Sequence, residues 1–275
     1  MLEVKHLQFG YVPDRDIFRD VTFSIGEGEF IAIGGRNGCG KTTITRLLVG
    51  LEKPTDGHIF YNGEDITKTS PAERGRYIGY VFQQPDRQMF RPTVAQEVAF
   101  GPETMGVSPE EVKASVAAAL EKTGISHLAE EYPPTLRRGE KQRVAIASAL
   151  AMNPKILILD EPTSGQDGTE TKALLELLQD LHKEGMTILL ITHDMEIMAG
   201  ICTRAIIMGN QTKAFDGTPE ELFTTRRDLR ALGLTKPASV YLSERCQGLG
   251  YCASMEDFTQ AVIKKFNAEE GPWND

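Results

Sequence analysis

The residue run with the clearest chemistry lies near the N-terminus, where closely spaced glycines end in a lysine and two threonines. It follows the apolar segment 30–33 and opens a stretch with helical spacing over 41–51. The run matches G-x-x-x-x-G-K-[ST] and contains Gly35, Arg36, Asn37, Gly38, Cys39, Gly40, Lys41 and Thr42, followed by Thr43. A strand, a glycine turn and a helix start in this order aim successive backbone N–H groups at one anion.

This run predicts a phosphate loop that binds a nucleoside triphosphate. Glycine lets the backbone approach phosphates closely and adopt left-handed conformations at low cost. Lys41 would reach the β- and γ-phosphates, and Thr42 would bind Mg²⁺. The alternative is a glycine-rich turn that carries a lysine by chance, and the flanking strand and helix disfavour it.

Two carboxylates, Asp160 and Glu161, end an apolar strand predicted over 155–160. An acidic residue at the carboxyl end of such a strand is where phosphate-loop enzymes hold Mg²⁺. Asp160 would hold the metal directly or through water, and Glu161 would orient or deprotonate an attacking water. The alternative is an ordinary acidic pair at a strand end. The presence of the phosphate loop favours the metal site over this alternative.

Polar residues also follow two other predicted strands: Gln83 comes after 77–82, and His193 after 187–192. A lone histidine at a strand end is more often structural than catalytic. A third motif, L-R-R-G-E-K-Q-R over 136–143, opens a helix after a proline-rich loop. Because Gly139 gives that helix an open N-terminus, the motif predicts a second anion site.

The elements that must position these residues are an α/β arrangement. Residues 2–33 predict a β-rich lobe, with strands over 4–9, 21–25 and 30–33. Further strands are predicted over 57–61, 77–82, 155–160, 187–192 and 206–208, with Asn62-Gly63 as a hairpin turn. Helical spacing predicts helices over 109–123, 140–152, 169–184 and much of 219–235 and 237–267. Residues 155–192 therefore predict a βαβ unit with buried strands.

Composition narrows the function classes. The chain has 275 residues and a net charge of −9, which disfavours general nucleic-acid binding. No stretch of 18 or more apolar residues appears and no secretory segment opens the chain, so we expect a protein of the cytosol or the cytosolic membrane face. The four cysteines lack zinc spacing and are expected to be thiols.

Taken in their order along the chain, the motifs described above resemble those of an ABC-transporter ATPase subunit, over about residues 1–225. Within that family the chain is most similar to the ATPases of energy-coupling-factor (ECF) uptake transporters, which import vitamins and metal ions. The residues that carry this closer resemblance are V-F-Q-Q-P-D-R-Q over 81–88, P-T-V over 92–94 and V-A-F-G-P-E over 98–103. Leu232-Gly233-Leu234 and the helices after it resemble the C-terminal extension of that group.

The resemblance implies an ABC-type P-loop NTPase fold: a β-rich lobe, a RecA-like parallel sheet core and a helical signature subdomain. It implies an ATPase domain over 1–228, with the helical subdomain at about 92–152, and a small helical extension over 229–275. The implied ligands are ATP and Mg²⁺. The implied partners are a second ABC ATPase, a transmembrane coupling subunit and a substrate-binding membrane subunit, with the chain peripheral on the cytoplasmic face.

The resemblance also assigns roles to single residues. Tyr11 would stack on adenine, with Phe9 as its rival, and either could belong to the core. Gln83 would touch Mg²⁺ and couple to the membrane subunit, Glu161 would be the catalytic base, and His193 would contact the γ-phosphate. The family's D-loop, which crosses the dimer interface, corresponds to Ser164, Gly165, Gln166 and Asp167.

The signature helix departs from the family pattern L-S-G-G-Q, because Arg137 and Arg138 replace the serine and the first glycine before Gly139 and Glu140. Losing a hydrogen bond to a charged group costs about 1.5–3 kcal/mol, enough to slow turnover roughly ten- to hundredfold. An arginine could instead bind the γ-phosphate of the opposite site, block dimer closure, or turn to solvent or a glutamate. We favour a natural subclass that forms a heterodimer with one altered site, with a homodimer as the alternative.

Two other functions compete with transport. A soluble ABC ATPase acting on nucleic acid often carries two phosphate loops or an inserted coiled coil, neither of which is found here. A regulatory nucleotide-binding module would be supported by Arg137 and Arg138 but opposed by Glu161 and His193. A GTPase is disfavoured because no N-K-x-D motif appears. The substrate would be specified by another chain, so vitamins, cobalt and nickel all remain open.

Overall fold

A computed structural model describes residues 1–13, 15–225 and 228–270, so the last five residues of the predicted C-terminal extension lie outside it. The strands form one ten-stranded sheet in the order β5-β4-β1-β2-β10-β9-β3-β8-β7-β6. Their bounds are Leu2–Phe9 (β1), Phe18–Ile25 (β2), Phe30–Gly35 (β3), Asp56–Tyr61 (β4), Glu64–Asp65 (β5), Ile78–Val81 (β6), Ile156–Asp160 (β7), Thr187–Ile191 (β8), Arg204–Gly209 (β9) and Thr212–Gly217 (β10).

The sheet has an antiparallel part and a parallel part. Strands β1, β2, β4 and β5 pair antiparallel near the N-terminus, whereas β3, β6, β7, β8 and β9 pair only in parallel with one another. The sequence places the strand over 30–33 in the β-rich lobe, but β3 lies between β8 and β9 in the parallel part. Every residue of β3 is buried. Strands inside a parallel sheet are covered on both faces, so they carry apolar runs without alternating polar residues, and β3 fits that position.

Parallel pairing brings the polar strand ends to one edge of the sheet. Ile33 of β3 and Asp160 of β7 are both opposite Ile191 of β8. Val81 of β6 is opposite Leu159 of β7. The residues that follow these four strands therefore meet at the carboxyl edge, where open α/β sheets bind their ligands.

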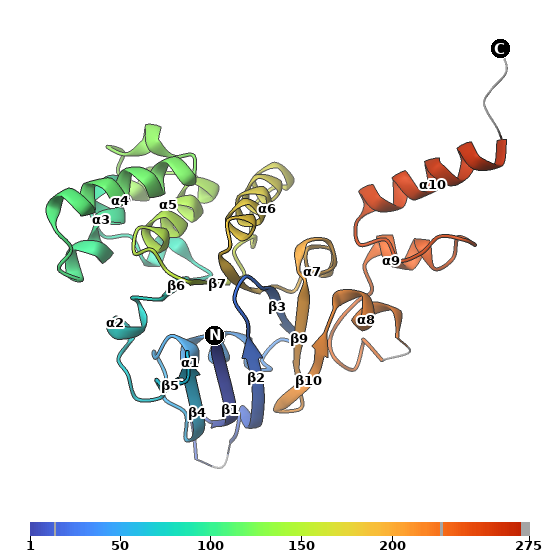
Figure 1. The fold of residues 1–275 in the computed structure, drawn as a ribbon, viewed down its shortest axis with the longest axis horizontal. Helices are drawn as coiled ribbons and strands as arrows, with labels where there is room; N and C mark the ends of the chain where they lie inside the picture. The colour runs from blue at the N-terminus through green and yellow to red at the C-terminus, as the bar shows by residue number, and fades with distance from the viewer. Residues whose placement is uncertain (14, 226–227, 271–275) are drawn as a thin grey trace.

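The helices cover both faces of the sheet and extend beyond it at two ends. They are Lys41–Leu48 (α1), Pro71–Arg74 (α2), Val94–Thr104 (α3), Pro109–Lys122 (α4), Arg138–Leu150 (α5), Gly168–Lys183 (α6), Met195–Ile201 (α7), Pro219–Thr224 (α8), Ala238–Ser243 (α9) and Met255–Glu270 (α10). Figure 1 shows α3, α4 and α5 grouped at one end of the molecule, with α9 and α10 at the opposite end.

Three apolar clusters hold these layers together. Alternate residues of the parallel strands point to opposite faces, so Phe30 and Leu157 belong to one cluster and Ile31 and Ile156 to another. Helix α6 packs on the first face and α1 on the second. The third cluster lies within the α3–α5 group and includes Val98 of α3. The group around the signature motif thus has a core of its own.

Several predicted elements differ from the structure. The helix predicted over 41–51 ends at Leu48, just before Gly50 adopts a φ of 79°. The long helical stretches predicted over 219–235 and 237–267 are too extensive, because α8 ends at Thr224 and no helix covers 244–254. The sequence does not predict β10, because Thr212 is its only β-branched residue and Lys213, Asp216 and Gly217 are of types depleted in strands. The βαβ unit β7–α6–β8 and the turn at Asn62-Gly63 between β4 and β5 are confirmed.

Candidate nucleotide-binding site

The phosphate loop joins β3 to α1 and depends on glycine at two positions. Gly35 has a φ of 137°, and a Cβ there would come within 2.3 Å of the Met208 carbonyl oxygen. Gly40 has a φ of 99°, and a Cβ there would come within 2.5 Å of the Phe18 ring. Both positions combine a left-handed backbone with close packing, so a side chain at either one would displace the loop.

The loop presents donors with no competing side chain. Helix α1 has Gly40 as its N-cap, without a side-chain cap and without an acidic residue in its first turn. Its first N–H groups are therefore open to an anion. Lys41 is buried and its Nζ donates to the carbonyl oxygens of Gly35, at 2.9 Å, and Arg36, at 3.1 Å. Arg36, Asn37 and Gly38 lie exposed at the crown of the loop.

Asp160 ends β7 beside this loop and is 2% exposed. Tyr80 of β6 donates from its hydroxyl to Asp160 Oδ2 at 3.4 Å, while Oδ1 is buried without a hydrogen-bond partner. Burial raises the pKa of Asp160, and a hydrogen bond with Thr42 opposes that shift. A buried carboxylate oxygen beside a threonine hydroxyl fits Mg²⁺, which takes few protein ligands and completes its shell with water and phosphate.

The described residues contain no group of three or more histidine, cysteine or acidic side chains that could hold a metal.

Glu161 lies at the centre of a small polar network. Its φ of 46° is in the left-handed region, which is uncommon for a residue with a side chain and is found at functional sites. Its carboxylate accepts from Gln83 Nε2 at 2.7 Å and from Ser164 Oγ at 3.3 Å. His193 Nδ1 lies 3.6 Å from Oε1, with the imidazole 64% exposed and the carboxylate 19% exposed.

Two cavities flank the phosphate loop. The first, of about 400 Å³, is lined by Gly35, Arg36, Asn37, Glu161, His193, Met195, Gly233 and Leu234. The second, of about 360 Å³, is lined by Thr42, Arg46, Phe82, Gln83, Gln84, Gln88 and Asp160. The predicted base and histidine therefore lie on one side of the loop, and the predicted metal ligands on the other.

The signature motif forms the first turn of α5, and Glu140 Oε2 accepts from the backbone N–H of Arg137 at 2.8 Å. Arg137 and Arg138 are both exposed, and neither forms an ion pair within the part of the chain that the structure describes. A Cβ on Gly165 would lie 2.9 Å from the Arg138 guanidinium carbon, so this arginine covers the chain's own D-loop. Gly139 similarly faces α6, because a Cβ there would lie 2.8 Å from Glu170 Oε1.

The two aromatic candidates for adenine stacking differ in exposure. Phe9 is 4% exposed and belongs to the core, whereas Tyr11 is 52% exposed. Their rings pack edge to face at 4.8 Å, so Phe9 supports Tyr11. Tyr11 is thus the accessible ring.

Cys39 in the loop is a free thiol, as are the other three cysteines. Burial raises the pKa of the Cys39 thiol.

Sequence reasoning missed two sets of residues here. Tyr80 contacts Asp160 and also shares a hydrogen bond with Thr45 of α1 at 3.3 Å. Its position two residues after Ile78 on a predicted strand was the available signal, since both side chains share a face. Gly233 and Leu234 line the cavity with Glu161 from more than 70 residues further along the chain, and no sequence pattern indicated that approach.

A parallel sheet with a lysine-bearing phosphate loop at its carboxyl edge, and an acidic strand end beside it, defines a P-loop NTPase. Comparison with known proteins narrows this class. The family model described as ABC transporter matches residues 18–164. The energy-coupling factor transporter ATP-binding protein EcfA of Methanosphaera stadtmanae is 39% identical, over 96% of this chain and 99% of its own length. The chain belongs to the ABC transporter family, as an ATP-binding protein that hydrolyses ATP to drive transport.

Solved structures agree. CbiO1 of Clostridium perfringens, described as part of the ABC transporter complex CbiONQ, superposes with a TM-score of 0.76 at 36% identity, over 88% of this chain and 98% of its own. The ATP-binding cassette MJ0796, solved as a dimer with ADP and Pi, gives 0.71 at 27% identity, over 80% and 99%. Together with EcfA, CbiO1 supports an ATPase of the energy-coupling-factor type. Among the described residues, no helix is long and apolar enough to cross a membrane.

Proposed function

We propose that this chain is the ATP-hydrolysing subunit of an ECF-type importer, which couples ATP hydrolysis to uptake of a vitamin or a metal ion through membrane partners. The observation that carries the proposal is the network around Glu161. Gln83, Ser164 and His193 converge on one carboxylate beside a complete phosphate loop. A regulatory module without turnover would have no need of this base.

The phosphates and Mg²⁺ are bound by different residues of the site. The loop from Gly35 to Thr43 and the N–H groups of α1 bind the phosphates, and Lys41 exchanges its two loop carbonyls for phosphate oxygens. Mg²⁺, when bound, neutralises charge on the phosphates. Thr42, Gln83 and Asp160 are the residues that would hold it.

Glu161 acts on the attacking water. As general base, it accepts the water's proton as the oxygen attacks the γ-phosphorus and the bond to the bridging oxygen breaks. His193 contacts the γ-phosphate from the same cavity. Tyr11 stacks on the adenine, since its ring is the exposed member of the Phe9–Tyr11 pair.

The second half of each ATP site comes from another ATPase subunit. Arg137, Arg138, Gly139 and Glu140 stand at the exposed start of α5, where a partner's nucleotide can approach. The dimeric cassette MJ0796 supports an ATPase dimer as the working unit. Because both signature arginines differ from the family pattern, we propose a heterodimer with one standard and one altered site, and keep the homodimer as the alternative.

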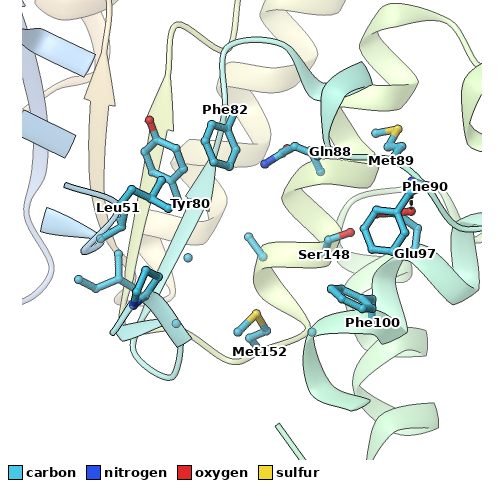
Figure 2. A pocket seen from close by; sticks show the side chains of 18 residues that line it. Leu51, Tyr80, Phe82, Gln88, Met89, Phe90, Glu97, Phe100, Ser148 and Met152 are labelled. Carbon is cyan, nitrogen blue, oxygen red and sulfur yellow. Dashed lines mark hydrogen bonds between the residues drawn. The ribbon is translucent and has the colours of Figure 1, made fainter. Parts of the chain in front are cut away.

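An apolar groove next to the Gln83 loop suits a membrane partner. Figure 2 shows it between β6 and the helices α3 and α5, with Tyr80 and Phe82 on one side and Phe90 and Phe100 on the other. Its volume is about 460 Å³. Phe90 is 63% exposed and Phe100 36% exposed, and their rings pack edge to face at 4.8 Å, so they form one exposed apolar patch. We propose that a helix of the transmembrane coupling subunit lies in this groove.

The groove and the site share a segment. Phe82 and Gln88 line both the groove and the cavity that contains Gln83 and Asp160. A helix bound in the groove would therefore contact the segment that carries Gln83. This supports the role of Gln83 in coupling, alongside its contact with Glu161.

The domain boundaries and the cellular location complete the proposal. The ATPase domain spans 1–228, the helical subdomain lies at about 92–152, and 229–275 form the C-terminal extension. The chain would be peripheral at the cytoplasmic face of the membrane, bound through its partners. A substrate-binding membrane subunit would complete the importer, and the acidic net charge of −9 disfavours nucleic acid as a partner.

Affinity purification of the tagged chain from native membranes in mild detergent, with mass spectrometry, tests this function. We expect a second ATPase and one or two multi-spanning membrane proteins to co-purify, and the membrane partners would indicate the substrate. Recovery of the chain alone, or with ribosomal or other soluble proteins, would overturn the transport proposal. A homodimer with membrane partners would overturn only the heterodimer.

A further inference from the structure

The start of the C-terminal extension packs directly against the phosphate loop. Gly233 has a φ of 72°, and a Cβ there would lie 2.3 Å from Arg36 Cγ and 2.9 Å from Arg36 Cα. Carbon atoms in contact normally stay about 3.5–4.0 Å apart. The two backbones therefore approach so closely that only glycine fits at position 233.

A compact turn presents this glycine to the loop. Gly233 N donates to the carbonyl oxygen of Arg230 at 3.0 Å, and Leu234 N donates to that of Leu229 at 2.8 Å. Leu234 is 3% exposed and joins the core cluster on one face of the parallel sheet. Its Cδ2 lies 3.8 Å from where a Cβ on Gly34 would be, so the leucine anchors the turn under the start of the phosphate loop.

The extension also contacts the helix that follows His193. Ala238 N donates to Glu196 Oε1 at 2.6 Å, and Glu196 lies in the first turn of α7. Helix α7 begins with Asp194 as its N-cap, directly after His193. The extension thus contacts the loop at Arg36, in the wall of the cavity, and α7 at Glu196, three residues after His193.

We propose that the C-terminal extension forms a wall of the ATP site, with Gly233 and Leu234 as positioning residues that fix the phosphate loop through Arg36. The inference rests on the proposed nucleotide site. Phosphate binding needs several backbone N–H groups aimed at once, and displacements of about 1 Å are costly in such sites. The turn opposes outward movement of the loop at Arg36. The turn 229–234 is then part of the ATP-binding machinery, in addition to any contact that the rest of the extension makes with partners.

A pair of matched glycine variants of the full chain tests the contact. Asparagine accepts a left-handed backbone, so Gly233→Asn introduces mainly the clash with Arg36. Gly248→Asn is the control, because Gly248 also lies in the extension with a φ of 79° and a Cβ there would meet only Lys265 Nζ, at 3.9 Å. We expect the Kd for ATP, with Mg²⁺ present, to rise at least tenfold in Gly233→Asn and to change less than twofold in Gly248→Asn.

Equal Kd values in Gly233→Asn and the unmodified chain would overturn the inference, as would a tenfold rise in both variants. If Gly233→Asn does not fold, hydrogen exchange of the unmodified chain tests the inference instead. We expect ATP with Mg²⁺ to slow exchange in both 35–42 and 229–234. Slowing in 35–42 without slowing in 229–234 would overturn the inference alone, and no slowing in either segment would overturn the proposed nucleotide site as well.

Discussion

Gln83 Nε2 donates to Glu161 Oε2 at 2.7 Å, and so joins the ends of two neighbouring parallel strands, β6 and β7. The contact holds one oxygen of the proposed base, while the other faces His193. Because Gln83 follows Phe82, which lines the apolar groove, the base is one hydrogen bond away from the segment that a membrane partner would contact. A helix bound in the groove would therefore contact Phe82, the neighbour of the residue that hydrogen-bonds the proposed base.

The first prediction concerns this base. Glu161→Gln keeps the size of the side chain but removes its ability to accept a proton, and general-base catalysis contributes about 10²–10⁴-fold. We expect ATP turnover of the assembled complex to fall by roughly that factor, with little change in the Kd for ATP. Glu176→Gln on the exposed face of α6 is the control. Unchanged turnover in Glu161→Gln would mean that this chain's site is not the working one.

The second prediction concerns Mg²⁺. A ligand that binds only the folded state raises its stability, so a metal held with ATP should raise Tm. We expect EDTA to lower the Tm of the ATP-bound chain, and Asp160→Asn to abolish that difference, because its buried carboxylate is lost. Asp180→Asn, at an exposed position of α6, should respond to EDTA as the unmodified chain does. An equal EDTA effect in Asp160→Asn would remove Asp160 from the metal site.

The gathering of the site residues was predictable from sequence because each follows an apolar run. Asp160 ends, and Gln83 and His193 follow, strands whose aliphatic content predicts burial in a parallel sheet. Parallel strands bring such ends to one edge, whatever the distance along the chain. The fold class followed from the same pattern. Which pairs of side chains touch, such as Gln83 with Glu161, required the structure.

The approach of Gly233 to Arg36 had no counterpart in the sequence. A glycine near a predicted helix end is interpreted as a turn, and its partner across space depends on how the extension packs. The sequence predicts nearly continuous helix in this region, whereas α8 ends at Thr224, α9 spans only Ala238–Ser243 and α10 begins at Met255. Helical periodicity in a chain segment says little about where packing ends a helix, because breakers act together with tertiary contacts.

The third prediction concerns the signature arginines. Arg138 covers Gly165 of the D-loop, so Arg137→Ser with Arg138→Gly both restores the family pattern and uncovers this loop. We expect turnover at the partner's site to change at least threefold, while the Kd for ATP of the isolated chain stays the same. Lys172→Ser at an exposed position of α6 controls for the loss of positive charge. Turnover that is unaltered by the double variant would rule out a signature role for these residues.

The fourth prediction concerns the apolar groove. Phe100→Glu places a charge in the groove, and burying an unpaired charge against an apolar partner is costly. We expect recovery of the membrane partners to fall at least fivefold while ATP binding is retained. Val107→Glu is the control, because Val107 is 37% exposed, close to the 36% of Phe100, and does not line the groove. Equal recovery with the two variants would place the membrane contact elsewhere.

The last prediction concerns pH and a charge cluster on β9 and β10. Burial alone raises the pKa of Asp216, but hydrogen bonds from Arg204 and Lys213 lower it overall. Arg204 Nε and Lys213 Nζ each lie 2.7 Å from an Asp216 oxygen. The pKa of Asp216 is therefore lower in the folded than in the unfolded state. It follows that the ionised carboxylate stabilises the fold at pH values above the unfolded-state pKa of about 3.9.

That contribution is lost as pH falls below about 4 and through the lower folded pKa. Hydrogen bonds to charged groups contribute about 1.5–3 kcal/mol, so Asp216→Asn should lower Tm by roughly 3–12 °C at pH 7. The difference from the unmodified chain should begin to shrink as pH approaches about 3.5, since the unfolded chain then takes up a proton that the folded carboxylate resists. Thermal unfolding of both chains between these pH values measures this, with Asp180→Asn as the exposed control. A Tm difference that is constant with pH would show that the charge of Asp216 does not stabilise the fold.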